Sequence, residues 1–131
     1  MSDPKLLLVD DEVEFLEPMA ARLARRRISC TTARCGEEAL EALTKDVFHC
    51  AVVDVRMPRM DGLELLRRMR RDYPDMAVIL LTGHACVELG VQGMELGAFD
   101  YLMKPVDLDE LLDAVRRAAQ SSAMTASGDH A

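Results

Sequence analysis

Short continuous runs of apolar residues recur along the chain and predict buried strands. The three runs are 6–9, 51–53 and 78–81, and polar residues follow each run directly. Continuous rather than alternating hydrophobicity is typical of a strand that is covered on both faces. Two further segments, 28–33 and 99–103, mix polar with apolar residues, which indicates strands at the edges of a sheet.

Segments with a helical period of apolar residues separate these strands. Five stripes have this spacing: Val13, Leu16, Ala20 and Leu23; Ala39, Leu40 and Leu43; Leu65, Leu66 and Met69; Val87, Val91, Met94 and Ala98; and Leu108, Leu111, Leu112 and Val115. Two helix starts are marked by an acidic cap with a glutamate three residues later, in the pairs Asp61 with Glu64 and Asp107 with Glu110. Pro18 removes a backbone hydrogen bond inside the first helix, where we expect a kink rather than a break.

The alternation of five strands with five helices predicts an α/β fold. Right-handed crossovers then build a parallel sheet with helices on both faces. Three apolar strands in the middle and two mixed strands at the edges match the order 2-1-3-4-5 of a flavodoxin-like, doubly wound five-stranded parallel sheet. We expect this domain to cover residues 1–120. The small, polar residues 121–131 lack periodicity and indicate a flexible C-terminal tail or the start of a linker.

Length, charge and cysteine usage exclude several classes of protein. A chain of 131 residues suits one domain with its own core, and its formal charge of −7 disfavours non-specific binding to nucleic acid or anionic lipid. We expect no secretory signal, and the longest apolar run, 76–81, is too short to span a bilayer. The cysteines lack metal-ligand spacing, which favours reduced packing residues in a cytoplasmic protein: Cys30, Cys35, Cys50 and Cys86.

Polar side chains of complementary charge follow four of the five expected strands. They are Asp10 and Asp11 after the first strand, Asp54 after the third, Thr82 after the fourth and Lys104 after the fifth. In a sheet of this order, ligands bind beyond the carboxyl ends of the strands, where the strand order reverses. Taken singly, the aspartates suit helix caps or solvated loops, and Thr82 suits a turn. Their coincidence at one edge favours a functional site.

The chemistry of this group indicates a hard cation and a phosphoryl group. Neighbouring strands lie about 4.8 Å apart, so the carboxylates repel one another unless a cation joins them. Oxygen ligands without cysteine or histidine favour Mg²⁺, which keeps positions open for water and phosphate. Lys104 adds a compact positive charge, and Thr82 offers a hydroxyl that can hydrogen-bond an oxyanion.

Four motifs occur in an order and spacing that are specific when taken together: LLVDDE at 7–12, DVRMPRMDG at 54–62, LLTG at 80–83 and GAFDYLMKP at 97–105. With them, the chain resembles the receiver domain of a two-component response regulator from about residue 5 to residue 120. The resemblance implies that Asp54 is a nucleophile. It would accept a phosphoryl group from a phosphohistidine on a histidine kinase or a histidine phosphotransfer protein.

The resemblance also implies roles for the other residues at this edge. Mg²⁺ would be held by a set of oxygen ligands: Asp11, Asp54 and the backbone carbonyl of Arg56, with Asp10 acting through water. Lys104 would pair with one phosphoryl oxygen, and Thr82 would move to hydrogen-bond another. These roles agree with the electrostatic interpretation above, since phosphoryl transfer depends on positioning and charge neutralisation.

A switch couple is implied by the same resemblance. Thr82 and Tyr101 would bias the face built from the fourth helix, the fifth strand and the fifth helix. Gly90 and Gly93 fall inside that fourth helix, where each costs about 0.5 to 1 kcal/mol relative to alanine. One hypothesis is a marginally stable helix that shifts on phosphorylation, and the alternative is that these glycines allow close packing.

Some basic residues have less determined roles. Arg56 and His84 resemble family positions that tune access of water to the acyl phosphate, although His84 also suits an ordinary surface position. Arginine clusters at 25–27 and 67–71 stand among acidic residues, which favours solvated helix faces over a nucleic-acid surface.

The leading hypothesis is a cytoplasmic phosphoacceptor switch that catalyses only its own phosphorylation and dephosphorylation. Its expected partners are the phosphohistidine donor and an output partner or domain, with no direct binding of nucleic acid or membrane. We expect a monomer, and leave dimerisation on phosphorylation open. One alternative is an interaction module with the same fold that works without phosphorylation. A nucleotide- or flavin-binding enzyme is disfavoured, because no Gly-x-Gly-x-x-Gly follows the first strand.

Overall fold

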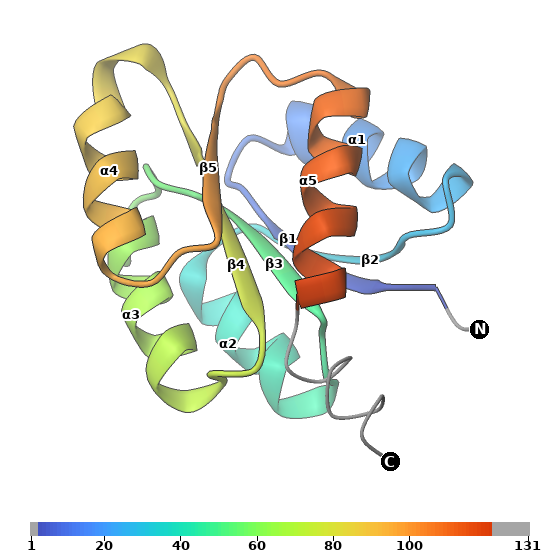
Figure 1. Cartoon of the computed structure of the whole chain (residues 1–131), viewed down its shortest axis with the longest axis horizontal. Coiled ribbons are helices and arrows are strands. Elements are labelled where there is room, and N and C mark those ends of the chain that lie inside the picture. Colours follow the sequence, from blue (N-terminus) through green and yellow to red (C-terminus); the bar gives the residue numbers. More distant parts are fainter. Residues whose placement is uncertain (1–2, 122–131) are drawn as a thin grey trace.

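The apolar runs of the sequence form the centre of a five-stranded parallel sheet in the computed structural model, which describes residues 3–121 (Figure 1). The strands are β1 (Lys5–Val9), β2 (Ser29–Ala33), β3 (Cys50–Asp54), β4 (Ala77–Thr82) and β5 (Asp100–Met103). Their order is β2-β1-β3-β4-β5, which confirms the predicted topology. Strands β1, β3 and β4 are the buried ones, and the mixed strands β2 and β5 lie at the edges.

Helices cover both faces of the sheet (Figure 1). They are α1 (Val13–Arg25), α2 (Gly36–Lys45), α3 (Gly62–Asp72), α4 (Val87–Glu95) and α5 (Leu108–Ser121), with a short 3₁₀ turn, η1 (His84–Cys86), before α4. Alternate residues of β1 point to opposite faces, so Leu6 and Leu8 pack in the core under α1 and α5, while Leu7 and Val9 pack under α2 and α3.

The helix starts follow the predicted signals. Asp61 Oδ1 accepts a hydrogen bond from the Glu64 amide at 2.9 Å, and Asp107 Oδ1 accepts one from the Glu110 amide at 2.7 Å. Each aspartate satisfies an amide that the helix itself leaves unpaired. Helix α1 continues through Pro18 to Arg25 without a break, as expected, and the kink at this proline stays a prediction.

The predicted apolar stripe was wrong for α4 at two of its four positions, although Ala98, just after the helix, is buried as expected. Val91 and Met94 are 47% and 40% exposed, and the helix turns Gly90 and Gly93 towards the sheet. Glycine has no side chain, so a pattern of apolar side chains cannot mark this packing face. A Cβ at Gly93 would lie only 2.1 Å from Leu80 Cδ1. The close approach supports the packing interpretation of these glycines, and marginal stability of α4 stays a prediction.

The register of the parallel strands brings their carboxyl ends to one edge. Val9 pairs with Val53, Asp54 pairs with Leu81, and Thr82 pairs with Met103. The residues that follow these strands therefore emerge side by side.

The last helix, α5, runs to Ser121, one residue past the predicted domain boundary, and residues 122–131 lie outside the described part. Within residues 3–121, none of the helices combines the length and apolar character that a bilayer crossing requires.

Candidate functional site

Two aspartates and a lysine meet at the carboxyl edge of the sheet. Asp10 is fully buried directly after β1, and Asp54, the last residue of β3, is 7% exposed. Lys104 Nζ lies 2.7 Å from Asp10 Oδ2 and 3.5 Å from Asp54 Oδ2. One ammonium group thus compensates two buried carboxylates, which would otherwise be costly to bury.

Backbone amides complete the contacts of these carboxylates. The Glu12 amide donates to Asp10 Oδ1 at 2.9 Å, and the Arg56 amide donates to Asp54 Oδ1 at 3.1 Å. The contact between Lys104 and Asp10 Oδ2 is an ion pair without hydrogen-bond alignment. Both aspartates therefore have one oxygen fixed by the backbone, and the other faces the ammonium group.

Burial and neighbouring charge perturb the protonation of the site. Burial, and next the Asp10 carboxylate, raise the pKa of Asp54 to about 6, although Lys104 and the Arg56 amide act in the opposite direction. Burial disfavours the charged form of Lys104, but its contacts with Asp10 and Glu12 outweigh this and raise its pKa. The ammonium group therefore stays charged, and Asp54 is mainly ionised above about pH 6.

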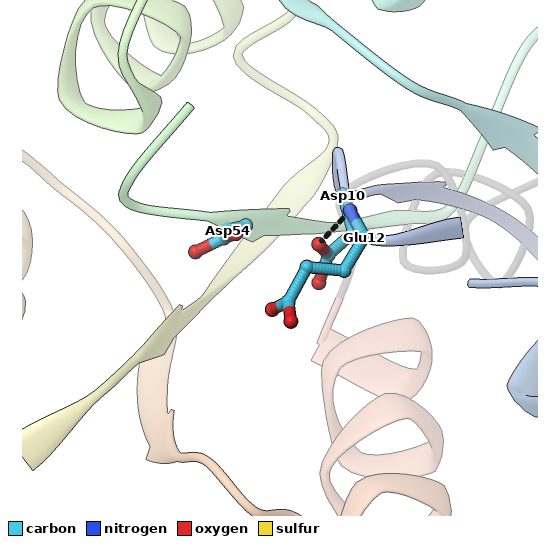
Figure 2. Close-up of side chains that lie close together, drawn as sticks. All are labelled: Asp10, Glu12 and Asp54. Carbon is cyan, nitrogen blue, oxygen red and sulfur yellow. Dashed lines mark hydrogen bonds between the residues drawn. The ribbon is translucent and has the colours of Figure 1, made fainter. Parts of the chain in front are cut away.

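A third carboxylate, that of Glu12, joins the cluster, and sequence reasoning had assigned it no role. Asp10, Glu12 and Asp54 each offer a carboxylate oxygen within 4.8 Å of the others (Figure 2). Glu12 Oε1 also lies 2.6 Å from Lys104 Nζ. The available signal was a third acid directly after the Asp10–Asp11 pair. Asp11 itself is exposed and lies outside this group of three, although its charge raises the pKa of Asp54.

The donor chemistry of the cluster suits a hard divalent cation. Its potential ligands are all oxygen atoms, and three carboxylates face a single ammonium group. Such a set favours Mg²⁺ over softer metals. The predicted ligand roles of Asp11 and the Arg56 carbonyl stay predictions.

Thr82 and Tyr101, the predicted switch couple, lie next to each other under α4. Thr82 is 1% exposed, and within the described chain its Oγ1 has no hydrogen-bond partner. A Cβ at Gly90 would lie 2.8 Å from the Tyr101 ring and 3.2 Å from Thr82 Cγ2. The glycine therefore lets α4 rest directly on both residues. A buried hydroxyl without a hydrogen-bond partner is unfavourable in free energy, so a new hydrogen bond at Thr82 Oγ1 would be stabilising.

A cavity of about 410 Å³ opens beside the site, between the loop after β3 and α4. It is lined by Val55, Arg56, Met57, Pro58, Asp61, Leu63 and Leu89. The exposed Arg56 side chain, which lines this cavity, also reaches Cys86, with Nη1 3.5 Å from Sγ. The side chain of His84, the other predicted tuning residue, lies outside what the structure describes.

Comparisons with known proteins agree with this geometry. Residues 6–116 match the family model of the response regulator receiver domain. The DNA-binding transcriptional regulator NtrC of Klebsiella pneumoniae is 40% identical over 111 residues, which are 85% of this chain and 24% of NtrC. The C4-dicarboxylate transport transcriptional regulatory protein DctD of Pseudomonas aeruginosa is 40% identical over 116 residues, which are 88% of this chain and 25% of DctD.

A solved structure extends the comparison to three dimensions. The crystal structure of a response regulator receiver domain protein from Clostridium thermocellum has a TM-score of 0.85 and 33% identity. The match covers 89% of this chain and 94% of that protein. By contrast, the chain spans about a quarter of the length of the curated relatives that it matches.

Proposed function

This chain belongs to the response regulator receiver domain family, and on that premise we propose that it is a phosphoacceptor switch of a two-component phosphorelay. Asp54 accepts a phosphoryl group from a phosphohistidine on a histidine kinase or a histidine phosphotransfer protein. The observation that carries the proposal is the buried Asp54 carboxylate, which faces Lys104 Nζ at 3.5 Å beside the buried Asp10.

In the proposed reaction, an oxygen of ionised Asp54 attacks the phosphorus atom of the phosphohistidine. A phosphorus–oxygen bond forms, the phosphorus–nitrogen bond breaks, and its electron pair returns to the imidazole nitrogen, which takes up a proton. The aspartyl phosphate is later hydrolysed by water. Because the pKa of Asp54 is about 6, the nucleophile is ionised at neutral pH without a separate base.

Charge neutralisation is the main contribution of the surrounding residues. Lys104 balances negative charge on the phosphoryl oxygens, and Thr82 gives its unpartnered hydroxyl to one of them. Mg²⁺, when bound, supplies further positive charge to the same oxygens. Its proposed ligands are those that the family resemblance implies: Asp11, Asp54 and the backbone carbonyl of Arg56, with Asp10 acting through water.

Movement of Thr82 carries the signal outward in this proposal. Thr82 and Tyr101 contact α4 at Gly90, so a new hydrogen bond at Thr82 changes the packing of α4 against β5. The altered face of α4, β5 and α5 then controls an output partner or domain. On this account the chain is a switch, and it catalyses only its own phosphorylation and dephosphorylation.

Intact mass after incubation with Mg²⁺ and acetyl phosphate tests the function. We expect one added phosphoryl group on the wild-type protein and none on Asp54→Asn. Asp113→Asn, which changes an exposed aspartate of α5, is the matched control and should accept the group normally. The absence of an adduct on the wild type, or an adduct on Asp54→Asn, would overturn the proposal in favour of a module that works without phosphorylation.

A further inference from the structure

Glu12 lacks the capping hydrogen bond that a residue at the start of a helix usually makes. It is the N-cap residue of α1, where Ser, Thr, Asp or Asn commonly accepts a hydrogen bond from a helix amide. The Glu12 side chain accepts no such bond. Its carboxylate instead contacts Lys104, 92 residues further along the chain, with Oε1 2.6 Å from Nζ.

Lys104 is shared among three carboxylates that differ strongly in exposure. The side chain of Asp10 is 0% exposed and that of Asp54 is 9% exposed, whereas that of Glu12 is 63% exposed. The two groups of an exposed ion pair can separate and become hydrated at little cost in free energy. A buried carboxylate that loses its counter-charge is strongly destabilised. Glu12 is therefore the partner that Lys104 gives up most easily.

We propose that the Glu12 carboxylate is a resident competitor of the phosphoryl group, holding Lys104 at the mouth of the site until a phosphoryl oxygen on Asp54 replaces it. This inference rests on the function proposed above. A carboxylate and a phosphoryl group present the same kind of anionic oxygen to one ammonium group. Glu12 is a positioning residue in this scheme, because it acts only through Lys104.

The other contacts of Lys104 keep the ammonium group in place when Glu12 is released. Its Nζ lies 4.9 Å from the centre of the Phe15 ring, in addition to its contacts with Asp10 and Asp54. Removal of the Glu12 carboxylate should therefore free one N–H donor of the Lys104 ammonium group without displacing the Lys104 side chain. Because Glu12 makes no capping bond, its replacement should also leave α1 folded.

Three variants distinguish loss of the contact between Glu12 and Lys104 from loss of a negative charge. Glu12→Gln removes the charge, whereas Glu12→Asp keeps it on a shorter side chain that an N-cap residue can turn towards its own helix amides. Glu14→Gln is the matched control, because Glu14 is an exposed acid in the same helical turn and makes no ion pair within residues 3–121. Circular dichroism establishes that all three are folded before they are compared.

Chemical labelling measures the contact without any phosphorylation. The chain has only three lysines, Lys5, Lys45 and Lys104, and Lys45 is an exposed internal reference. With a trace of acetic anhydride, we expect the labelling ratio of Lys104 to Lys45 to rise about threefold in both Glu12 variants, as expected for the loss of one surface ion pair. The ratio should not change in Glu14→Gln.

Phosphorylation kinetics measure the competition. With acetyl phosphate and saturating Mg²⁺, the rate constant for phosphorylation should rise about threefold to fivefold in Glu12→Gln and Glu12→Asp, and stay at the wild-type value in Glu14→Gln. An equal rise in Glu14→Gln would show a general charge effect and overturn the inference. A fall in the rate with a weakened response to Mg²⁺ in Glu12→Gln would make Glu12 a metal ligand and also overturn it.

The two proposals fail in different ways. If every variant is phosphorylated at the wild-type rate and the labelling ratio does not change, only the role of Glu12 is overturned. If no variant and no wild-type protein takes up a phosphoryl group, the proposed function fails and this inference fails with it.

Discussion

Replacement of Asp54 by asparagine should stabilise the protein at neutral pH when metal is removed with a chelator. Asp54 is buried beside Asp10, and its pKa is about 6 in the folded protein against an ordinary value of 3.8. The folded state therefore disfavours the ionised form of this side chain. Asparagine has nearly the same shape and carries no charge, so it removes that penalty.

The pH window follows from the two pKa values. Well below pH 3.8 the carboxyl is protonated in both states, and no penalty exists. As the pH rises from about 3 to about 6, the unfolded chain loses its proton first, so the stability of the wild type falls and then levels off. The difference of about 2 between the pKa values of the folded and unfolded states corresponds to a loss of stability of at most about 3 kcal/mol. Screening by solvent at the mouth of the site lowers this loss to about 1–2 kcal/mol.

Urea denaturation across this pH range, with a chelator present, checks the reasoning. The difference in unfolding free energy between Asp54→Asn and the wild type should approach zero towards about pH 3 and reach its plateau above about pH 6. Added Mg²⁺ should then narrow the difference, because it binds the folded wild type more tightly. Asp109→Asn, whose side chain is 88% exposed, should show no such profile. A difference that does not depend on pH, or an asparagine variant that is less stable at neutral pH, would refute the argument.

Three further substitutions test the packing that builds the site, each by urea denaturation. A Cβ at Gly62 would lie 2.4 Å from the last carbonyl oxygen of β3, so Gly62→Ala should lower the free energy of unfolding by about 2–3 kcal/mol. Gly83 has open space around it, so Gly83→Ala should stay within about 0.5 kcal/mol of the wild type. Equal losses in the two variants would contradict this. Lys104→Met leaves a fully buried aspartate without its counter-charge and should lose about 3 kcal/mol, whereas Lys45→Met at an exposed position should be nearly neutral. Asp61→Ala removes the cap of α3 and should cost about 1 kcal/mol, and no loss would show that this hydrogen bond is unimportant.

The fold was predictable because hydrophobicity and strand position are directly linked in a doubly wound sheet. A strand such as 51–53 is apolar throughout since helices cover both of its faces, and an edge strand such as 29–33 is not. The meeting of Asp10, Asp54 and Lys104 was predictable for a related reason. Parallel strands end at the same edge, so the residues after them become neighbours whatever their separation in sequence.

The role of Glu12 and the packing of α4 could not be predicted in the same way. The contact between Glu12 and Lys104 depends on the direction that a flexible side chain takes, and an N-cap position gives no sign of a partner 92 residues away. For α4, the packing face consists of Gly90 and Gly93, while the apolar Val91 and Met94 are exposed. A method that follows apolar side chains therefore selects a different face of this helix from the one that packs on the sheet.

The central claim is that Asp54 itself carries the phosphoryl group. After incubation with acetyl phosphate and Mg²⁺, borohydride reduces an aspartyl phosphate to an alcohol, and tryptic mapping locates the altered residue. The tryptic segment 46–56 contains Asp54 and one other acid, Asp46, which fragmentation distinguishes. The account predicts reduction at Asp54 alone, dependent on Mg²⁺. Reduction at Asp10, Asp11 or Asp46, or none at any residue, would contradict it.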